Sequence, residues 1–281
     1  MFKAINTKIL LSGATVLAAA ALIIGGTFAF FSDTETSTGN TFAAGSIDLK
    51  VSNESYLLVD GEMEPQPDLS WEAGDLDDQL FFDYEDLKPG DLGEDTIDLV
   101  IEDNDAWTCM DVELTATPEN GQTEPEAVVD TTVGSDEGEL QDEINFVWWV
   151  DDGDNVLEDD EVDSVFNSGS LADMDGFSVA IADSTEESLT GGKPITGGEE
   201  FFIGKAWCFG DLTADESTAL PDLDVDGEED NRTPDERGAG VTCEGSEVGN
   251  ESQTDGVVGN VSFYAEQSRN NDDFECEVPE E

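Results

Sequence analysis

The chain has 281 residues, of which 70 are Asp or Glu, 9 are Lys or Arg and none is His, so its formal net charge is −61. Such a surface repels phosphate backbones and anionic headgroups, which argues against nucleic-acid and peripheral membrane binding. The lack of histidine excludes a Ser-His-Asp triad, a Cys-His pair and an HExxH zinc site, and we expect no enzymatic activity.

The acidic excess predicts a protein adapted to high salt. Like charges oppose compaction unless they are screened, and the Debye length falls from about 10 Å at 0.1 M to about 3 Å at 1 M salt. Disorder is the competing interpretation of high net charge. However, hydrophobic residues make up 37% of the chain, with 15 Phe and 5 Trp that lie in discrete runs. This distribution favours a folded domain.

The N-terminus has the pattern of a secretory signal peptide. A short basic start precedes an uncharged run over residues 9–32. Small residues at its end predict removal of residues 1–30, with a cut near Ala29 or Phe30. A retained anchor is the alternative, because the run is long enough to span a bilayer. Gly25-Gly26 would weaken a helix there, so we expect cleavage, a secreted or cell-surface protein and no membrane span after cleavage.

Short apolar runs predict β-strands along the rest of the chain. Ile47, Leu49 and Val51 alternate on one face, as in a half-buried strand, whereas the run 144–150 is apolar on both faces. No segment has a sustained helical stripe. The predicted fold class is therefore all-β, a jelly-roll-like β-sandwich in a single domain over 46–281, preceded by an extended segment over 31–45. The predicted strands cover 46–51, 98–101, 111–115, 144–150, 177–182, 200–207 and 257–265.

The four cysteines predict two disulfides, because an even count in an exported chain favours bridges. Three pairings are open. Cys109 and Cys208 both lie in aromatic strand contexts and Cys243 and Cys276 bracket the last predicted strand, so we expect Cys109–Cys208 and Cys243–Cys276. A zinc site is disfavoured, since there is no CxxC spacing and no histidine.

Two acidic loops are candidate calcium sites, although such patterns also arise by chance in so acidic a chain. The first follows the predicted strand 144–150, and the second has acids at positions 1, 3 and 5 and glycine at position 6 of a calcium loop, but lacks the acid at position 12. The alternative for both is a solvated, salt-binding loop. The candidate ligands are Asp152, Asp154, Asn155 and Glu158 in the first loop, and Asp222, Asp224 and Asp226 in the second.

Asn-X-Ser/Thr sequons make Asn53, Asn231 and Asn250 glycosylation candidates on an exported protein. A fourth sequon at Asn260 lies within a predicted strand and is the weakest of the set.

Four short segments resemble the TasA/camelysin family of exported biofilm-matrix and cell-surface proteins. They are GTFAFFSD (26–33), TFAAGSIDL (41–49), DLKPGD (86–91) and VSFYAEQ (261–267). The resemblance implies a signal peptide cut by a SipW-type signal peptidase. It also implies a jelly-roll-like sandwich and extracellular fibres in which each subunit's N-terminal segment adds a strand to its neighbour. Camelysin-type members carry a metalloprotease label, which a chain without histidine does not support.

We therefore expect a secreted, non-enzymatic fibre subunit that forms a head-to-tail homopolymer through residues 31–42. An extended tail can pair with an exposed sheet edge, and such contacts propagate filaments. Screening of the charge should be needed for assembly, by high salt or divalent cations. The same segment is alternatively a disordered terminus or the first strand of its own sheet. Rival functions are a monomeric surface module binding calcium or carbohydrate and, third, a hydrolase using carboxylates.

Overall fold

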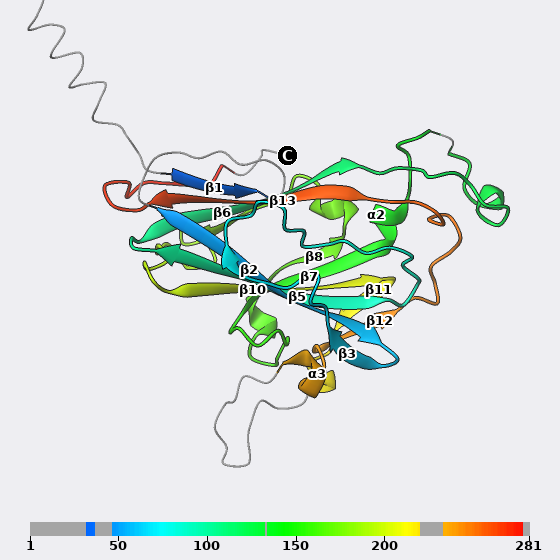
Figure 1. Cartoon of the computed structure of the whole chain (residues 1–281), viewed down its shortest axis with the longest axis horizontal. Coiled ribbons are helices and arrows are strands. Elements are labelled where there is room, and N and C mark those ends of the chain that lie inside the picture. Colours follow the sequence, from blue (N-terminus) through cyan, green and yellow to red (C-terminus); the bar gives the residue numbers. More distant parts are fainter. Residues whose placement is uncertain (1–31, 37–46, 133, 220–232, 278–281) are drawn as a thin grey trace, which may run out of the picture.

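Antiparallel strands are the main regular structure of the computed structural model, which describes residues 32–36, 47–132, 134–219 and 233–277. The all-β prediction is confirmed. A four-stranded sheet has the order β1-β13-β6-β9, and a seven-stranded sheet has the order β3-β2-β5-β10-β7-β8, with β4 also pairing β2. Figure 1 shows the two sheets as facing layers, with β1, β13 and β6 on one side and β2, β5 and β10 on the other.

The strands of the smaller sheet are β1 (Ser32–Thr36), β13 (Val258–Gln267), β6 (Ala106–Ala116) and β9 (Ser178–Ala182). Those of the larger sheet are β3 (Glu62–Pro65), β2 (Asp48–Val59), β4 (Trp71–Gly74), β5 (Leu92–Glu102), β10 (Glu200–Phe209), β7 (Ile144–Asp151) and β8 (Val165–Ser170). A separate pair consists of β11 (Asp211–Ala214) and β12 (Val241–Glu244).

Helical structure in the described residues is limited to single turns. They are α2 (Leu140–Glu143), α3 (Pro234–Arg237), η1 (Glu126–Val128), η2 (Val162–Ser164), η3 (Ala172–Met174) and η4 (Glu216–Thr218).

The main hydrophobic core lies between the two sheets. Leu49 and Ile97 enter it from the larger sheet, and Met110 and Phe263 enter it from the smaller one, all without exposed surface. The predicted alternation holds in β2, where Leu49 and Val51 are buried and the residues between them are partly exposed. Period-two alternation therefore decides which side chains form this core.

The prediction that β7 is buried on both faces is also confirmed. Trp148 faces the main core, whereas Trp149 belongs to a second cluster on the outer face of the larger sheet. Gly204 on β10 lies beneath the Trp149 ring, and a Cβ at that position would collide with the indole. The second cluster is closed from outside by Leu157, which has no exposed surface.

A lysine–carboxylate ion pair lies inside the main core, between two neighbouring strands of the larger sheet. Lys205 and Asp95 lie opposite each other on β10 and β5, their Nζ and Oδ2 atoms are 3.0 Å apart, and neither side chain is exposed. The ammonium also lies over the rings of Phe81 and Phe82, 5.7 and 4.8 Å from their centroids. Burial lowers the pKa of Lys205, while Asp95 opposes that shift by favouring the charged form.

The two disulfides differ from the predicted pairing. The bonds are Cys109–Cys276 and Cys208–Cys243, with Cα separations of 5.8 and 5.5 Å. Cys109–Cys208 was wrong because both side chains point away from the shared core: Met110 and Trp207, their chain neighbours, face it instead. Cys208 lies in the outer cluster and Cys109 lies in neither cluster. The predicted Cys243–Cys276 bond was also wrong. Cys276 is bonded to Cys109 of the smaller sheet, and Cys243 is bonded to Cys208 of the larger sheet.

The predicted strands correspond to β2, β5, β6, β7, β9, β10 and β13. The sequence interpretation missed the shorter strands, such as β3 and β4. In β3 only one residue is buried, and in β4 no residue is fully buried. These strands are four residues long, too short for a periodic pattern, and they form only when a longer neighbour supplies backbone partners.

Candidate functional site

An N-terminal strand covers one edge of the smaller sheet. β1 pairs antiparallel with β13, from Ser32 opposite Glu266 to Thr36 opposite Ser262. The other side of β13 is paired with β6, so β13 would be the outermost strand without β1. In the predicted donor segment 31–42, residues 32–36 lie on the chain's own sheet. Residues 31 and 37–42 lie outside the described residues, as do the predicted signal peptide and the cut sites Ala29 and Phe30.

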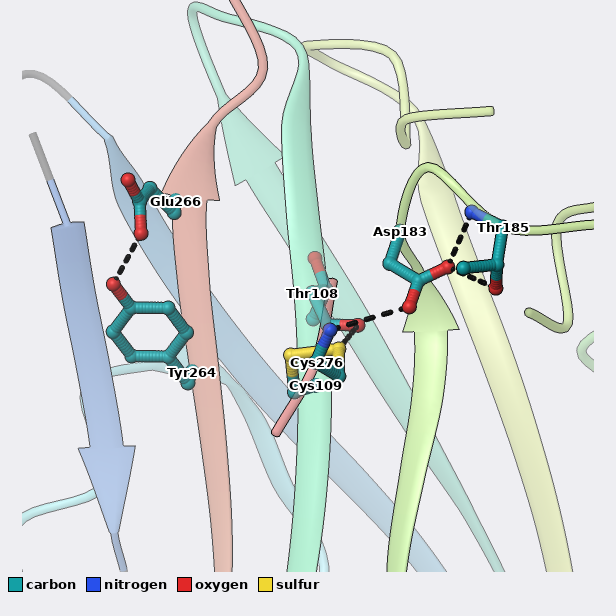
Figure 2. Close-up of a disulfide and its surroundings, with 7 residues drawn as sticks. All are labelled: Thr108, Cys109, Asp183, Thr185, Tyr264, Glu266 and Cys276. Atoms are coloured by element: carbon teal, nitrogen blue, oxygen red, sulfur yellow. Dashed lines mark hydrogen bonds between the residues drawn. A yellow bond between two sulfur atoms is a disulfide. The ribbon is translucent and has the colours of Figure 1, made fainter. Parts of the chain in front are cut away.

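The C-terminal segment, residues 268–277, supports β13 independently of β1. Glu266 of β13 accepts hydrogen bonds from the Tyr264 hydroxyl at 2.6 Å and from the Asn271 amide at 3.0 Å. Tyr264 stacks on Phe274 with ring centroids 6.2 Å apart. The Tyr264–Glu266 hydrogen bond lies next to β1 (Figure 2).

A disulfide anchors that segment to the sheet. Cys276 is bonded to Cys109 of β6, and its backbone N–H donates to Asp183 Oδ2 at 3.2 Å. The other Asp183 oxygen accepts from the N–H and the hydroxyl of Thr185, at 2.8 and 2.6 Å (Figure 2). The edge at β13 is therefore held in shape by covalent and polar contacts that do not involve β1.

The first predicted calcium loop, residues 151–161, brings three of its four candidate ligands together. Carboxylate oxygens of Asp152, Asp154 and Glu158 all lie within 4.8 Å of one another. Asn155 is 1% exposed, and its side-chain amide is 3.5 Å from Glu54 Oε2. Arg237 of α3 donates to both Asp154 and Glu158. The arginine already supplies one positive charge at this position, and calcium binding here stays a prediction.

Asp151 and Glu161 were not among the predicted ligands, yet they form a second trio with Asp152, within 4.8 Å. Burial raises the pKa of Asp151 to about 7 and that of Glu161 to about 10. Asp151 accepts from the Thr96 hydroxyl at 3.2 Å, and Glu161 accepts from the Asp152 N–H at 2.9 Å. These hydrogen bonds fold the loop back onto the end of β7.

Glu94 on β5 adds a further buried acid beneath this loop. It has no exposed surface, and neither of its oxygens has a hydrogen-bond partner among the described residues. Burial raises its pKa well above the usual value, and the negative charge of Asp151 raises it further. Sequence reasoning missed Glu94 because its context, Gly93-Glu94-Asp95, has the composition of a loop.

A groove of about 570 Å³ lies beside the loop on the outer face of the larger sheet. Its lining includes the aromatic side chains of Trp71 and Phe202 and the carboxylates of Glu54 and Asp98. The Trp71 indole N–H donates to the Val51 carbonyl at 3.2 Å, which fixes its ring at the groove wall. Burial raises the pKa of Asp98 to about 6, and Glu200 raises it further.

The remaining predicted sites have different outcomes. Asp222, Asp224, Asp226 and Asn231 lie outside the described residues. Glycosylation at Asn53 is wrong for the folded chain, because its side chain is 2% exposed and its amide donates to the Leu69 carbonyl at 2.8 Å. Asn250 is exposed, and its glycosylation stays a prediction.

Within the described ranges, no helix is long and apolar enough to cross a membrane. No curated protein and no solved structure matches the chain significantly. Residues 4–70 match the model of the camelysin metallo-endopeptidase family. This match covers the N-terminal segment together with β1, β2 and β3 and ends just before β4.

The family description implies a metal, and the residues of this chain do not fit a zinc peptidase centre. Peptidase zinc sites are built mainly on imidazole ligands, and the chain contains no histidine. All four cysteines are in disulfides. Only carboxylates are left as strong ligands, and these suit calcium better than zinc. The sequence match over residues 4–70 nevertheless supports an assignment to the TasA/camelysin family.

Proposed function

We propose that this chain is a secreted structural subunit of extracellular fibres, in which β1 of one copy pairs with β13 of the next. The observation that carries the proposal is the position of β1 at the edge of the smaller sheet, paired with β13 through five residues. Family membership supports export and assembly. Removal of the signal peptide near Ala29 or Phe30 by a signal peptidase would free this strand to move.

The same backbone hydrogen bonds satisfy β13 whether β1 comes from its own chain or from a neighbour. Residues 37–47 join β1 to the strand β2, and eleven fully extended residues would span at most about 36–40 Å. This reach suffices to carry β1 to an adjacent subunit. A head-to-tail contact of this kind uses two different surfaces and does not close, so it propagates a filament.

Electrostatics sets the conditions of assembly. The full chain has a net charge of −61, and removal of residues 1–30 takes away Lys3 and Lys8 but no acid, so the subunits repel one another strongly at low ionic strength. Molar salt shortens the screening length to about 3 Å, which leaves backbone pairing and apolar contact to decide association. We therefore place fibre formation at high salt or in the presence of divalent cations.

Cysteine cross-linking across the β1–β13 register tests strand exchange directly. Thr36 and Ser262 are opposite each other. We expect a mixture of the single variants Thr36→Cys and Ser262→Cys to give covalent dimers under oxidising conditions in molar salt. The double variant, oxidised as a dilute monomer, should lock β1 on its own sheet and abolish the filaments seen by electron microscopy.

Ser178→Cys provides the matched control, because Ser178 lies on β9 at the opposite edge of the same sheet. Thr36→Cys mixed with Ser178→Cys should give no dimer. Filaments that persist in the locked double variant would refute strand donation. Mass spectrometry of the secreted protein would show whether its N-terminus is residue 30 or 31.

The groove beside Trp71 favours a second candidate, a cell-surface module that binds carbohydrate. Aromatic rings next to carboxylates suit the apolar faces and hydroxyls of sugars. Trp71→Ala would weaken glycan binding without changing filaments, whereas the locked β1 variant would change filaments alone. These two variants therefore distinguish a fibre subunit from a carbohydrate-binding module.

A further inference from the structure

The ion pair between Lys205 and Asp95 is sealed inside the main core. The two residues lie opposite each other on β10 and β5, Lys205 Nζ is 3.0 Å from Asp95 Oδ2, and neither side chain has any exposed surface. Among the lysines that the structure describes, only Lys205 is buried. The ion pairs of Lys50 and Lys88 lie at the surface, with both partners partly exposed.

The contact does not satisfy either group as a hydrogen-bonding partner. Lys205 Nζ and both carboxylate oxygens of Asp95 are buried, and none of these three atoms has a hydrogen bond among the described residues. An ammonium group offers three donors, and a buried ion pair offsets its desolvation only when further hydrogen bonds complete it. Lys205 faces the rings of Phe81 and Phe82 instead. The two groups are therefore in contact but poorly stabilised as separate charges.

The surroundings favour the uncharged form of the lysine. Burial lowers the pKa of Lys205 by more than the negative charge of Asp95 raises it. An uncharged lysine amine in an apolar pocket is a nucleophile. Transfer of one proton from the ammonium to the carboxylate within the pair gives an amine next to a carboxylic acid. This neutral pair suits a core from which water is excluded, because no charge is left to solvate.

We propose that Lys205 and Asp95 condense to an isopeptide bond that joins β10 to β5. Lys205 Nζ attacks Asp95 Cγ, a C–N bond forms, and the bond from Cγ to one carboxyl oxygen breaks. That oxygen leaves as water, with one proton from the acid and one from the amine, so the step needs no oxidant, reductant or other reactant. Groups held in contact react with effective molarities of up to about 10⁵–10⁸ M, which compensates for the low reactivity of a carboxylic acid.

Two hydroxyl groups lie on the β2 side of Asp95. Ser55 of β2 is opposite Asp95, and its hydroxyl oxygen is 3.2 Å from that of Tyr84. Burial raises the pKa of Tyr84, and the negative charge of Asp95 raises it further, so the phenol stays protonated. The Tyr84 hydroxyl is therefore available as a proton donor to the oxygen that leaves Asp95.

The bond joins two strands at the centre of the larger sheet, where β5 lies between β2 and β10, and β10 lies between β5 and β7. Neither disulfide links β5 to β10, since Cys208 of β10 is bonded to Cys243 of β12 and the other bond starts from β6. With the isopeptide bond in place, β5 and β10 cannot separate unless a covalent bond breaks. The bond is independent of the β1–β13 edge, so it stands whether or not fibres form.

Mass spectrometry of the whole secreted protein tests the proposal. The protein is reduced and denatured, and its mass is compared with that of the mature sequence after the N-terminus has been identified. We expect a deficit of one water. Proteolysis should release a branched peptide in which Lys205 Nζ is joined to Asp95, and tandem spectra would locate the bond. Trypsin should not cleave after Lys205, because its side chain no longer carries a charge.

Lys50 is the matched control within the same molecule, because its Nζ is 3.3 Å from Glu102 Oε1 across β2 and β5, but both side chains are partly exposed. It should stay in a linear peptide with a free amine, and Lys50→Met should still lose one water. Lys205→Met should have the full mass. In Asp95→Asn the same attack would expel ammonia, so its product should have the same mass as the cross-linked native chain.

A full mass for the folded native protein would overturn the proposal. A lost water with Lys205 in a linear peptide, as succinimide formation at an Asp-Gly step would give, would overturn it as well. The native protein alone decides between these outcomes, so the test does not depend on whether Lys205→Met folds.

Discussion

The segment 117–139 and the 151–161 loop are both acid-rich connections that follow long strands, yet they bury opposite kinds of residue. In the 151–161 loop Val156 and Leu157 have no exposed surface, and Leu157 is part of the outer cluster. In segment 117–139 Val128 and Val129 are exposed and Glu126 is buried. Composition alone does not separate these two cases.

The difference shows two ways in which an acidic chain tolerates buried carboxylates. Arg237 reaches Asp154 and Glu158 from α3, so part of the charge in the 151–161 loop is compensated within the chain. No ion pair reaches segment 117–139 in the described part of the chain, and one carboxylate oxygen each of Glu119, Glu139 and Asp255 lies within 4.8 Å of the others. The 151–161 loop is therefore held by an ion pair and apolar contacts, whereas the buried Glu126 in segment 117–139 keeps one oxygen without a hydrogen-bond partner among the described residues.

Removal of Arg237 should give the largest loss of stability, because it takes away the positive partner of the 151–161 loop. We expect Arg237→Met to lower the free energy of unfolding by about 3–5 kcal/mol, because it leaves Asp154 buried without its partner. Urea unfolding in molar KCl, followed by Trp fluorescence, measures the change. Arg269→Met removes the same charge from an exposed position and should change stability by less than about 0.5 kcal/mol. Equal effects of the two variants would mean that the pair contributes nothing.

Truncation of one apolar side chain in each connection should destabilise the protein only where that side chain is buried. Leu157→Ala should cost about 2–5 kcal/mol, because it opens a cavity under a fully buried residue. Val129→Ala should cost less than about 0.5 kcal/mol, since that side chain is more than half exposed. Thermal unfolding of both variants, at one salt concentration, gives the ranking. A large loss from Val129→Ala would show that segment 117–139 is held by apolar contacts after all.

The pH dependence of stability tests the buried acids of the 151–161 loop. Burial raises the pKa of Asp151 to about 7 and of Asp154 to about 8, from the usual 3.8. A carboxyl whose pKa is higher in the folded chain takes up a proton on folding. Stability of the calcium-free protein should therefore rise as the pH falls from about 8 toward 4. Melting temperatures measured across this range should show a shallower slope in Asp154→Asn than in the native chain. A slope of opposite sign would contradict the pKa shifts.

Much of the fold follows from local sequence patterns. The alternation at Ile47, Leu49 and Val51, and the two-sided apolar run of β7, identify strands and their faces. The first acidic loop was identified as well, since Asp152, Asp154 and Glu158 do converge. Arg237 and Glu94 were missed because each comes from an element far away in the chain, and no local pattern connects them to that loop.

The amino-acid order alone specifies the strand class of the fold, the even number of cysteines and the net charge of −61, because these depend on composition and on a period of two residues. The tertiary structure decided which cysteines meet, since Cys109 and Cys208 point away from the core they flank. It also brought carboxylate oxygens of Glu119 and Asp255 within 4.8 Å of each other, although the two residues are distant in sequence. Both outcomes depend on which strands become neighbours, and that choice is made by the packing of the whole sandwich rather than by any single segment.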